Sequence, residues 1–475
     1  MASRLDNLLL LFVVVASLPL ATLLLWLNYA AVILASQRSK IPFRKLKSTP
    51  KKTILVTGTA NAQGLNIARA LERAGHRLIG ADLQSLGHLD ISRRSRALTK
   101  HYALPPLSAA ADASYFARWV LEIVTRENVD LWIDCSHDIP LDAIALTRER
   151  VEGNTRCACI AADRNSSRYF KDKETLLEFF RGRNLPAPEM HRVRSRGDIH
   201  NVLNHGQGQK QYLLKSPMKS KLEVSQTLLP RRTLSQTYQD VSLVKITPGS
   251  SLILEEYLDS STKYQCTAIA IRGSVEAFWV KRILASGVDV AAGGPALQQA
   301  LRSYTEAVVR ELGHDFSCHL TLSFVLSERI THAGVAQLIL PVEGSLRLHP
   351  TFVPTAGLPG SSSLAETYLS MLRSVANGMA ITSTPSFRKH VTNSKTSQPI
   401  KESYFLPDTI SDLFWEPCKG LLLLRVSPRE VLGSIGALTQ KLLLGREAYY
   451  DFWDPVPAFW QYTIVLAWRV LVGTT

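Results

Sequence analysis

Residues 169–193 read YFKDKETLLEFFRGRNLPAPEMHRV, which predicts a turn, a helix and an extended exit. The helix is expected over residues 172–184, because Asp172 is a suitable N-cap. Leu176, Leu177 and Phe180 also share one face of it at helical spacing. The two prolines of the Leu-Pro-x-Pro element stop the helix. The sequence therefore predicts a capped amphipathic helix whose direction of exit is set by proline.

A short strand ending in a lysine is predicted next, from the run QYLLKS at residues 211–216, where Lys215 closes the apolar part. The run SLILEEYL at residues 251–258 predicts another strand with an acidic end. Apolar runs at 266–271 and 274–280, joined by an Arg272-Gly273 turn, predict an antiparallel hairpin. A helix, a lysine-ended strand and antiparallel strands in this order are typical of a nucleotide-binding α+β domain.

The region before this domain alternates between strand and helix patterns. Residues 53–57 (TILVT) predict a strand, a helical pattern runs to Ala74, and residues 77–81 predict a second strand. Further strands are expected at 129–134 and 157–161. Such alternation favours an open parallel sheet to about residue 170.

Taken in order, these segments resemble the ATP-grasp ligases, in the branch related to biotin carboxylase and the carbamoyl-phosphate synthase large chain. The resemblance covers about residues 53–355 and implies a Rossmann-like pre-ATP-grasp domain that precedes an ATP-grasp fold of mixed α/β and α+β class. Asp454-Pro455-Val456-Pro457 resembles the tail of fungal members found among secondary-metabolite enzymes. The implied function is an ATP-dependent ligase that joins a carboxylic acid to an amine, with amino acids as one class of substrate, through an acyl phosphate.

The resemblance also implies which residues bind ATP. Lys173 and Lys215 match the two lysines that reach the phosphates from opposite sides. The adenine hinge corresponds to Glu255, Glu256, Tyr257 and Leu258. The family's ribose-binding glutamate is replaced by Lys263, which weakens ribose binding.

Mg²⁺ is the second implied cofactor, because it is hard, prefers carboxylate oxygens and bridges phosphates. Glu343 matches a family ligand, whereas Ser323 and Ser345 stand where an acid and an asparagine are expected. Either the ligand set is reduced or the register differs, with Glu328 as a substitute. Arg347 matches a catalytic arginine, whose planar fork suits phosphoryl or carboxylate oxygens.

The composition limits which kinds of protein this chain can be. With 475 residues, of which 46% are hydrophobic and 20% charged, the chain can form two or three domains and is not typical of a disordered protein. A large part of the net charge of +15 is local, because residues 38–52 hold seven Lys or Arg and no acid, and no nucleic-acid partner is expected. Six dispersed cysteines favour neither a disulfide framework nor a zinc site.

An uncharged run occupies residues 8–35, that is, 28 positions. It is long enough to span a bilayer, which takes roughly 20 apolar residues. The basic residues follow it, so the positive-inside rule predicts a single-pass membrane protein with its catalytic domain facing the cytosol. The basic residues would then lie against anionic membrane lipid.

The expected organisation is an anchor at 1–37, a linker at 38–52, the Rossmann-like domain at 53–170, the ATP-grasp domain at 171–355 and a C-terminal region at 356–475. Within this last region, the Ser- and Thr-rich residues 361–401 predict a loop or a partly disordered insert. The aromatic and apolar end, from residue 451 on, predicts either an interfacial helix or packing on the protein's own core.

Two other functions remain open. Thr57-Gly58 with Gly64, and Tyr169 four residues before Lys173, are features of a membrane-anchored short-chain dehydrogenase, although Ala62 stands where its pattern has glycine. The replacements Ser323, Ser345 and Lys263 are in turn typical of an ATP-grasp relative that binds nucleotide or a partner with impaired turnover.

Overall fold

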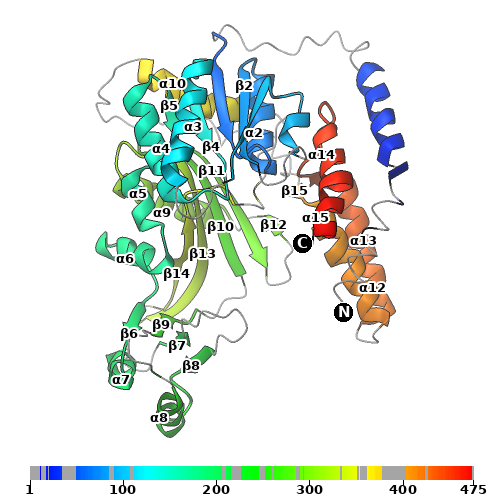
Figure 1. Cartoon of the computed structure of the whole chain (residues 1–475). Coiled ribbons are helices and arrows are strands. Elements are labelled where there is room, and N and C mark those ends of the chain that lie inside the picture. Colours follow the sequence, from blue (N-terminus) through cyan, green and yellow to red (C-terminus); the bar gives the residue numbers. More distant parts are fainter. Residues whose placement is uncertain are drawn as a thin grey trace. The chain divides into compact units, whose positions relative to one another are not determined.

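The computed structural model describes most of the chain in two compact units, residues 1–163 with 347–475, and residues 164–346 (Figure 1). The described residues are 11, 16, 18–19, 21–34, 50–84, 90–106, 112–205, 210–215, 226–244, 246, 252–258, 262–284, 289–291, 294–331, 334–349, 352, 361–376, 403–422 and 426–472. The first unit contains both the N-terminal sheet and the C-terminal segment.

A five-stranded parallel sheet forms the centre of the first unit, with the order β3-β2-β1-β4-β5. Its strands are β1 (Thr53–Thr57), β2 (Arg77–Leu83), β3 (Lys100–Leu104), β4 (Leu131–Asp134) and β5 (Ala158–Ile160). The predicted parallel sheet is confirmed. The strand order reverses direction between β1 and β4, as in doubly wound sheets.

Helices cover both faces of this sheet. They are α2 (Ala62–Arg73), α3 (Asp112–Glu127), α4 (Leu141–Asn154) and α10 (Ser361–Ala376). The pair α3 and α4 packs together, and α10 packs against α2 (Figure 1). The tight turn after β1 needs Gly58, whose φ is +81° and whose place would put any Cβ 2.3 Å from the Cys135 carbonyl carbon.

The loop predicted over residues 361–401 is wrong in its first part, where α10 forms. Leu364, Tyr368 and Leu369 are 1–7% exposed, so burial of one helical face outweighs the Ser-rich start. Residues 377–400 lie outside the described part of the chain.

The C-terminal segment packs on α2 through buried polar contacts. The guanidinium of Arg69 donates to the Asp454 carboxylate at 2.9 Å and to the Asp454 and Tyr449 carbonyls, and both charged side chains are almost fully buried. Ser95 adds a 2.6 Å bond to Asp454. Asp451 in turn pairs with Arg73 at 2.6 Å. Of the two interpretations of this end, packing on the protein's own core therefore holds for residues 451–465.

A helical hairpin precedes this segment. It consists of α11 (Leu406–Ile410), the π-helical turn η3 (Ser411–Trp415), α12 (Glu416–Leu422) and α13 (Pro428–Leu444). The parallel bridge between β15 (Ser403–Tyr404) and β16 (Arg446–Glu447) closes its base. The chain then continues through α14 (Val456–Trp460), the π-helical turn η4 (Gln461–Val465) and α15 (Leu466–Val472).

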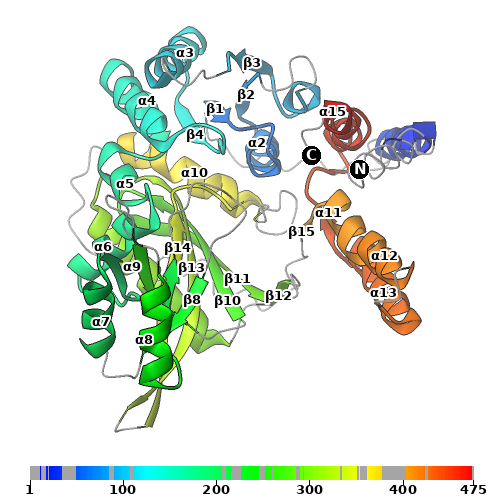
Figure 2. The ribbon, with the colours of Figure 1, turned by 60° about the horizontal axis from the view of Figure 1, so that its bottom comes forward.

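The second unit is built around a five-stranded antiparallel sheet of order β12-β11-β10-β13-β14. These strands are β10 (Thr262–Ile271), β11 (Ser274–Leu284), β12 (Asp289–Ala291), β13 (Cys318–Thr331) and β14 (Gly334–Ser345). Two helices, α6 (Lys173–Gly182) and α9 (Pro295–Leu312), pack on one face of it (Figure 2). The predicted hairpin at Arg272-Gly273 is confirmed, with Arg272 and Gly273 both at positive φ.

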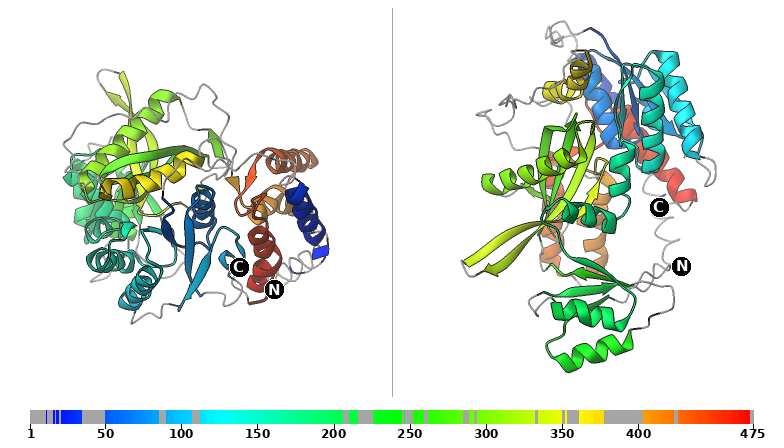
Figure 3. Two further views of the ribbon diagram at one scale, coloured as in Figure 1. Left: turned by 90° about the horizontal axis from the view of Figure 1, so that it is seen from above. Right: turned by 90° about the vertical axis from the view of Figure 1, so that its left-hand side faces the viewer.

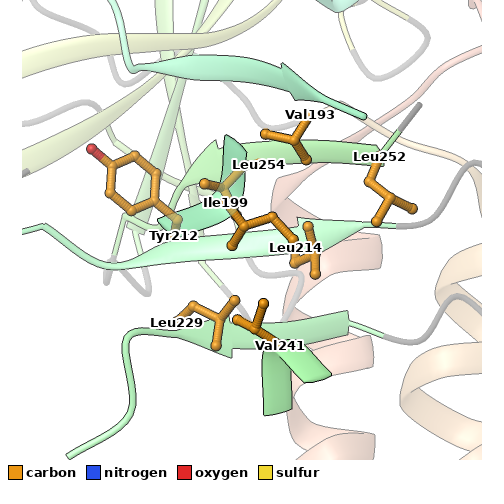
Figure 4. Packing of buried hydrophobic residues seen from close by; sticks show 8 residues of the cluster. All are labelled: Val193, Ile199, Tyr212, Leu214, Leu229, Val241, Leu252 and Leu254. Carbon is orange, nitrogen blue, oxygen red and sulfur yellow. The ribbon is translucent and has the colours of Figure 1, made fainter. Parts of the chain in front are cut away.

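A smaller antiparallel sheet, of order β6-β9-β7-β8, belongs to the same unit. It contains β6 (Met190–Val193), β7 (Tyr212–Lys215), β8 (Gln226–Leu229) and β9 (Leu252–Glu256), with α7 (Arg196–His205) and α8 (Leu234–Leu243) on one side (Figure 3). Alternate residues of these strands point into a common core with Ile199 and Val241 of the two helices (Figure 4).

Among the residues that the structure describes, no helix combines the length and the apolar character needed to cross a membrane. The predicted span at residues 8–35 is described only at residues 11, 16, 18–19 and 21–34, so part of that prediction falls outside the described residues.

We predict that Asp454→Ala lowers the free energy of unfolding of the first unit by about 3 kcal/mol or more, because it leaves the buried Arg69 charge without its partner. Denaturant unfolding followed by circular dichroism measures this. The matched control is Asp240→Ala, which breaks the surface pair of Arg231 and Asp240 at 2.6 Å and should cost less than about 1 kcal/mol. Equal losses in the two variants would show that the buried pair does not hold the C-terminal segment.

Candidate functional site

Lys173 is the first residue of α6, and the local sequence explains its position. The Asp172 carboxylate accepts a 2.9 Å hydrogen bond from the Thr175 backbone N–H and so caps the helix. The buried residues Leu177 and Phe180 of the same helix hold it to the sheet. The Lys173 side chain is 30% exposed.

Lys215 is the last residue of β7, which pairs antiparallel with β9. Leu213 pairs with Glu255 and Lys215 pairs with Ile253. Because successive side chains on a strand point to opposite faces, Lys215 and Glu255 lie on the same face of the small sheet. The opposite face carries the apolar core of Figure 4, including Leu214, Leu252 and Leu254.

These elements bring both lysines to one carboxylate. Lys173 Nζ donates to Glu255 Oε1, and Lys215 Nζ donates to Glu255 Oε2 at 2.6 Å. Burial by itself would raise the pKa of Glu255, but the hydrogen bonds and charges of the two lysines outweigh it and lower that pKa below its ordinary value. The carboxylate therefore stays ionised between two cations.

The three side chains together carry a net charge of +1 and are still reachable from solvent. Lys173 and Lys215 are 30% and 34% exposed, whereas Glu255 is 13% exposed. A polyphosphate carries more negative charge than one carboxylate and offers several oxygens, so it can bind both ammonium groups at once. The site thus presents two cations, from different elements, to an anionic ligand.

The predicted hinge residues follow directly after Glu255. Glu256 is 7% exposed and accepts a 2.8 Å hydrogen bond from the Glu189 N–H. The Tyr257 N–H donates to the Gln211 carbonyl at 2.7 Å, so it already has a partner within the protein. The Glu256 N–H also donates to the Glu189 carbonyl at 2.8 Å, so the backbone at the end of β9 is bonded on both sides, and Leu258 comes next along the chain. The adenine-binding role of these residues stays a prediction.

A second polar cluster lies at this end of the small sheet, and the sequence analysis missed it. Glu189 accepts hydrogen bonds from Lys210 at 2.6 Å and from Tyr212 at 2.7 Å. Burial opposes ionisation, but these bonds and the Lys210 charge lower the pKa of Glu189 to about 2. Lys210 also lies 3.5 Å from the Glu256 carboxylate. The available signal was the position of Glu189 and Lys210, each just before a short strand.

The strand register determines which residues accompany Glu343. Ser323 of β13 pairs directly with Glu343 of β14, and Thr321 pairs with Ser345. These four side chains therefore lie on one face. Gly344 faces the other way, where an added Cβ would lie 2.8 Å from Leu176 of α6. Ser323 is thus the direct cross-strand neighbour of the exposed Glu343.

No group of three or more His, Cys, Asp or Glu in the described part of the chain could hold a metal ion. The suggested substitute, Glu328, has a side chain outside the described residues. Lys263, at the predicted ribose position, pairs in register with Val325 and Ile283 and is exposed.

Arg347 belongs to the first unit. Its guanidinium donates to the backbone carbonyls of His137 and Ile139, in the loop that follows β4. Burial and the Arg347 charge lower the pKa of His137. The guanidinium therefore holds the β4–α4 loop in this structure, and its catalytic role stays a prediction.

The features that favoured a dehydrogenase are arranged differently from what that function needs. Asp82, at the end of β2, is 5% exposed and is bonded to Thr59 at 2.5 Å and to Ser92 at 2.9 Å, so it is turned inward. Tyr169 ends α5 (Arg164–Tyr169), whereas Lys173 begins α6. The pair therefore does not lie one turn apart on a single helix.

No family model matches the chain, and no curated protein matches it. Solved structures do. One is the N5-carboxyaminoimidazole ribonucleotide synthetase of Thermus thermophilus, at 20% identity and a TM-score of 0.42, covering 62% of this chain and 71% of that one. A second is the biotin carboxylase subunit of pyruvate carboxylase, at 12% identity and a TM-score of 0.48, covering 68% and 70%.

A third is the L-amino acid ligase of Bacillus licheniformis, at 13% identity and a TM-score of 0.42, covering 69% of this chain and 75% of that one. At this level of likeness, none of these activities carries over to this chain.

We predict that Ser323→Asp creates a site for divalent cations, because Cβ atoms of directly paired residues lie about 4.5–5.5 Å apart and two carboxylates would then face each other. Calorimetry with Mg²⁺ or Mn²⁺ alone should show affinity roughly tenfold higher than in the parent protein, as expected for an added carboxylate ligand. The double variant Ser323→Asp with Glu343→Ala should lose the gain. Unchanged affinity in Ser323→Asp would mean that the two side chains do not share a site.

Proposed function

We propose that the chain is an ATP-dependent carboxylate–amine ligase of the ATP-grasp kind, with Lys173 and Lys215 as its phosphate-binding groups. The observation that carries the proposal is the convergence of these two lysines on Glu255 from a helix start and a strand end. The two lysines belong to different elements, α6 and β7, yet both bind the carboxylate of Glu255. A further support is the β9 strand end, whose backbone is held rigidly beside them.

In the proposed reaction, an oxygen of the substrate carboxylate attacks the γ-phosphorus of ATP, and the bond to the β-γ bridging oxygen breaks. ADP leaves and an acyl phosphate forms. The substrate amine then attacks the acyl carbon, phosphate leaves, and the amine loses a proton. The two lysines would neutralise phosphate oxygens during the first step, which is the main task of the protein in phosphoryl transfer. Glu255 would hold both ammonium groups in position to bind phosphate oxygens.

The residues near Glu343 fit a Mg²⁺ ion in part. One carboxylate with hydroxyl neighbours is a small protein ligand set, but Mg²⁺ is often held by one or two carboxylates together with substrate phosphates and waters. When bound, the ion would screen charge on the phosphate oxygens. Glu343 would supply the negative protein ligand, and Ser323 and Ser345 would lie beside it. We propose Arg347 as a group that binds the transferring phosphoryl group or the substrate carboxylate.

The substrates in this proposal are a small carboxylic acid and a small amine, with amino acids as one class. We also propose a place in specialised metabolism, for which the support is the sequence resemblance of residues 454–457 alone. In the structure, Asp454 pairs with Arg69 in the core.

A second candidate is an ATP-grasp relative that binds nucleotide with impaired turnover. The observation that favours it is Ser323 directly across from Glu343, where a second carboxylate is expected. In such a protein, the two lysines would still bind phosphate, but weak metal binding would slow acyl-phosphate formation.

Lys215→Ala should reduce ATP affinity at least about tenfold and abolish ADP release, because it removes one of the two ammonium groups that converge on the ligand. Calorimetry with Mg-ATP and a coupled assay of ADP release with mixed acids and amines measure this. The matched control is Lys171→Ala, an exposed lysine two residues before Lys173. Full ADP release by Lys215→Ala would contradict the ligase proposal.

The same measurements distinguish the two candidates. ATP binding that depends on Lys215, together with ADP release under at least one acid and amine pair, supports the ligase. ATP binding without release in any pair, and restored release in Ser323→Asp, supports the impaired relative.

We further propose that residues 1–37 anchor the protein to a membrane with residues 53–475 on the cytosolic side; the support is the uncharged run at 8–35 and the basic run after it. Deleting residues 1–37 should move part or all of the protein into the soluble fraction after cell lysis. A protein that stays fully with the membranes after this deletion has its main attachment elsewhere.

A further inference from the structure

The helical hairpin of residues 406–444, formed by α11, η3, α12 and α13, exposes large apolar side chains. The exposed fractions are 40% for Ile410, 42% for Phe414, 39% for Trp415, 69% for Leu432 and 42% for Leu442. Single exposed apolar residues are ordinary on protein surfaces. Five within one two-helix element mark a surface that something apolar covers.

The middle of α13, between Glu430 and Lys441, is also uncharged. From Val431 to Gln440 the helix has no charged residue, and Val431 is buried there. The exposed positions of this stretch are Leu432, Gly433, Gly436, Ala437, Thr439 and Gln440. A helix in water normally turns a charged and polar face outward. Over residues 431–440, the exposed positions of α13 instead carry a leucine, small residues and neutral polar groups.

The apolar exposure is spread over both helical segments of the hairpin. Leu432 and Leu442 are ten residues apart on one helix, which at 3.6 residues per turn rotates them by about 80° from each other. Phe414 and Trp415 are consecutive on the neighbouring segment, so their side chains also diverge. A partner protein covers one side of a hairpin, whereas lipid chains surround it. Phe and Trp at the rim of such a surface suit the boundary between headgroups and acyl chains.

A second apolar helix is attached beside the base of this hairpin. The described helix at 21–34 exposes Trp26 by 73% and Leu27 by 57%. Within the first unit, its Asn28 side chain donates a 2.6 Å hydrogen bond to the Tyr450 hydroxyl, three residues after the strand that closes the hairpin. Seven Lys or Arg follow at residues 38–52. Their charge complements anionic headgroups.

We propose that the hairpin at 406–444 inserts into one leaflet of a lipid bilayer, as a membrane contact additional to the N-terminal segment. Leu432 would lie among the acyl chains, with Phe414 and Trp415 at the boundary with the headgroups. The proposal does not depend on the ligase function, because it concerns a surface of the first unit that carries none of the predicted ATP-binding residues.

Depth-dependent fluorescence quenching tests the proposal on the full chain. Cys418 is partly exposed and the other five cysteines are buried, so Cys418→Ser provides a background for a single label. Leu432→Cys carries an environment-sensitive fluorophore, and Tyr238→Cys, at an exposed position of α8, is the matched control. Vesicles of phosphatidylcholine and phosphatidylserine contain lipids with a quencher on the acyl chain.

The label at residue 432 should shift to shorter wavelength and be quenched by the acyl-chain quencher, while the label at residue 238 should not. Adding Gly436→Glu, one turn away, should reduce the quenching roughly threefold or more, because a carboxylate is costly among acyl chains. That site tolerates a side chain, since an added Cβ meets no atom within 4 Å.

Equal, weak quenching at residues 432 and 238, in protein that sediments with the vesicles, would overturn the proposal. A label at residue 432 that is shielded but not quenched, and whose shielding grows with protein concentration, would also overturn it, because a second copy of the chain would then cover the surface.

Discussion

The candidate site depends on the two ion pairs that the Glu255 carboxylate makes with Lys173 and Lys215. Two ammonium groups at close range repel each other, and an anion between them removes that cost. The contact needs β9 between β6 and β7 in the observed register, and it needs α6 to begin at Lys173, which the Asp172 cap ensures. The apolar core on the other face of the small sheet holds these elements in place. Apolar side chains are thus buried on one face of the small sheet, and the charged side chains of the site lie on its other face.

A different constraint organises the first unit. Arg69 lies in α2, and its buried guanidinium donates to the Asp454 carboxylate and to the Asp454 and Tyr449 carbonyls, which come from the end of the chain. Desolvating such a pair is costly, and breaking it is more costly still. The segment after residue 446 is therefore an integral part of the N-terminal unit, although almost 300 residues of sequence, roughly two domains, lie between them.

Local patterns predicted several of the regular elements. Short apolar runs between turns identified β1, β2, β4 and β5, because strand formation there follows from hydrophobic residues bounded by Gly and polar turns. The same holds for α6, with its cap and its proline exit. The pattern failed at α10, where three serines at the start suggested a loop. It also missed the partnership of Glu189 with Lys210, because their contact depends on two strands meeting through β9.

The sequence by itself determined the element order, the lysine at the start of α6, the lysine at the end of β7 and the uncharged N-terminal run, since each depends on neighbouring residues. Only the tertiary structure decided that Lys173 and Lys215 share Glu255, that Ser323 faces Glu343, and that Arg347 binds the carbonyls of the β4–α4 loop. These contacts join residues that are distant in the chain. They depend on strand register and packing, which no local preference specifies.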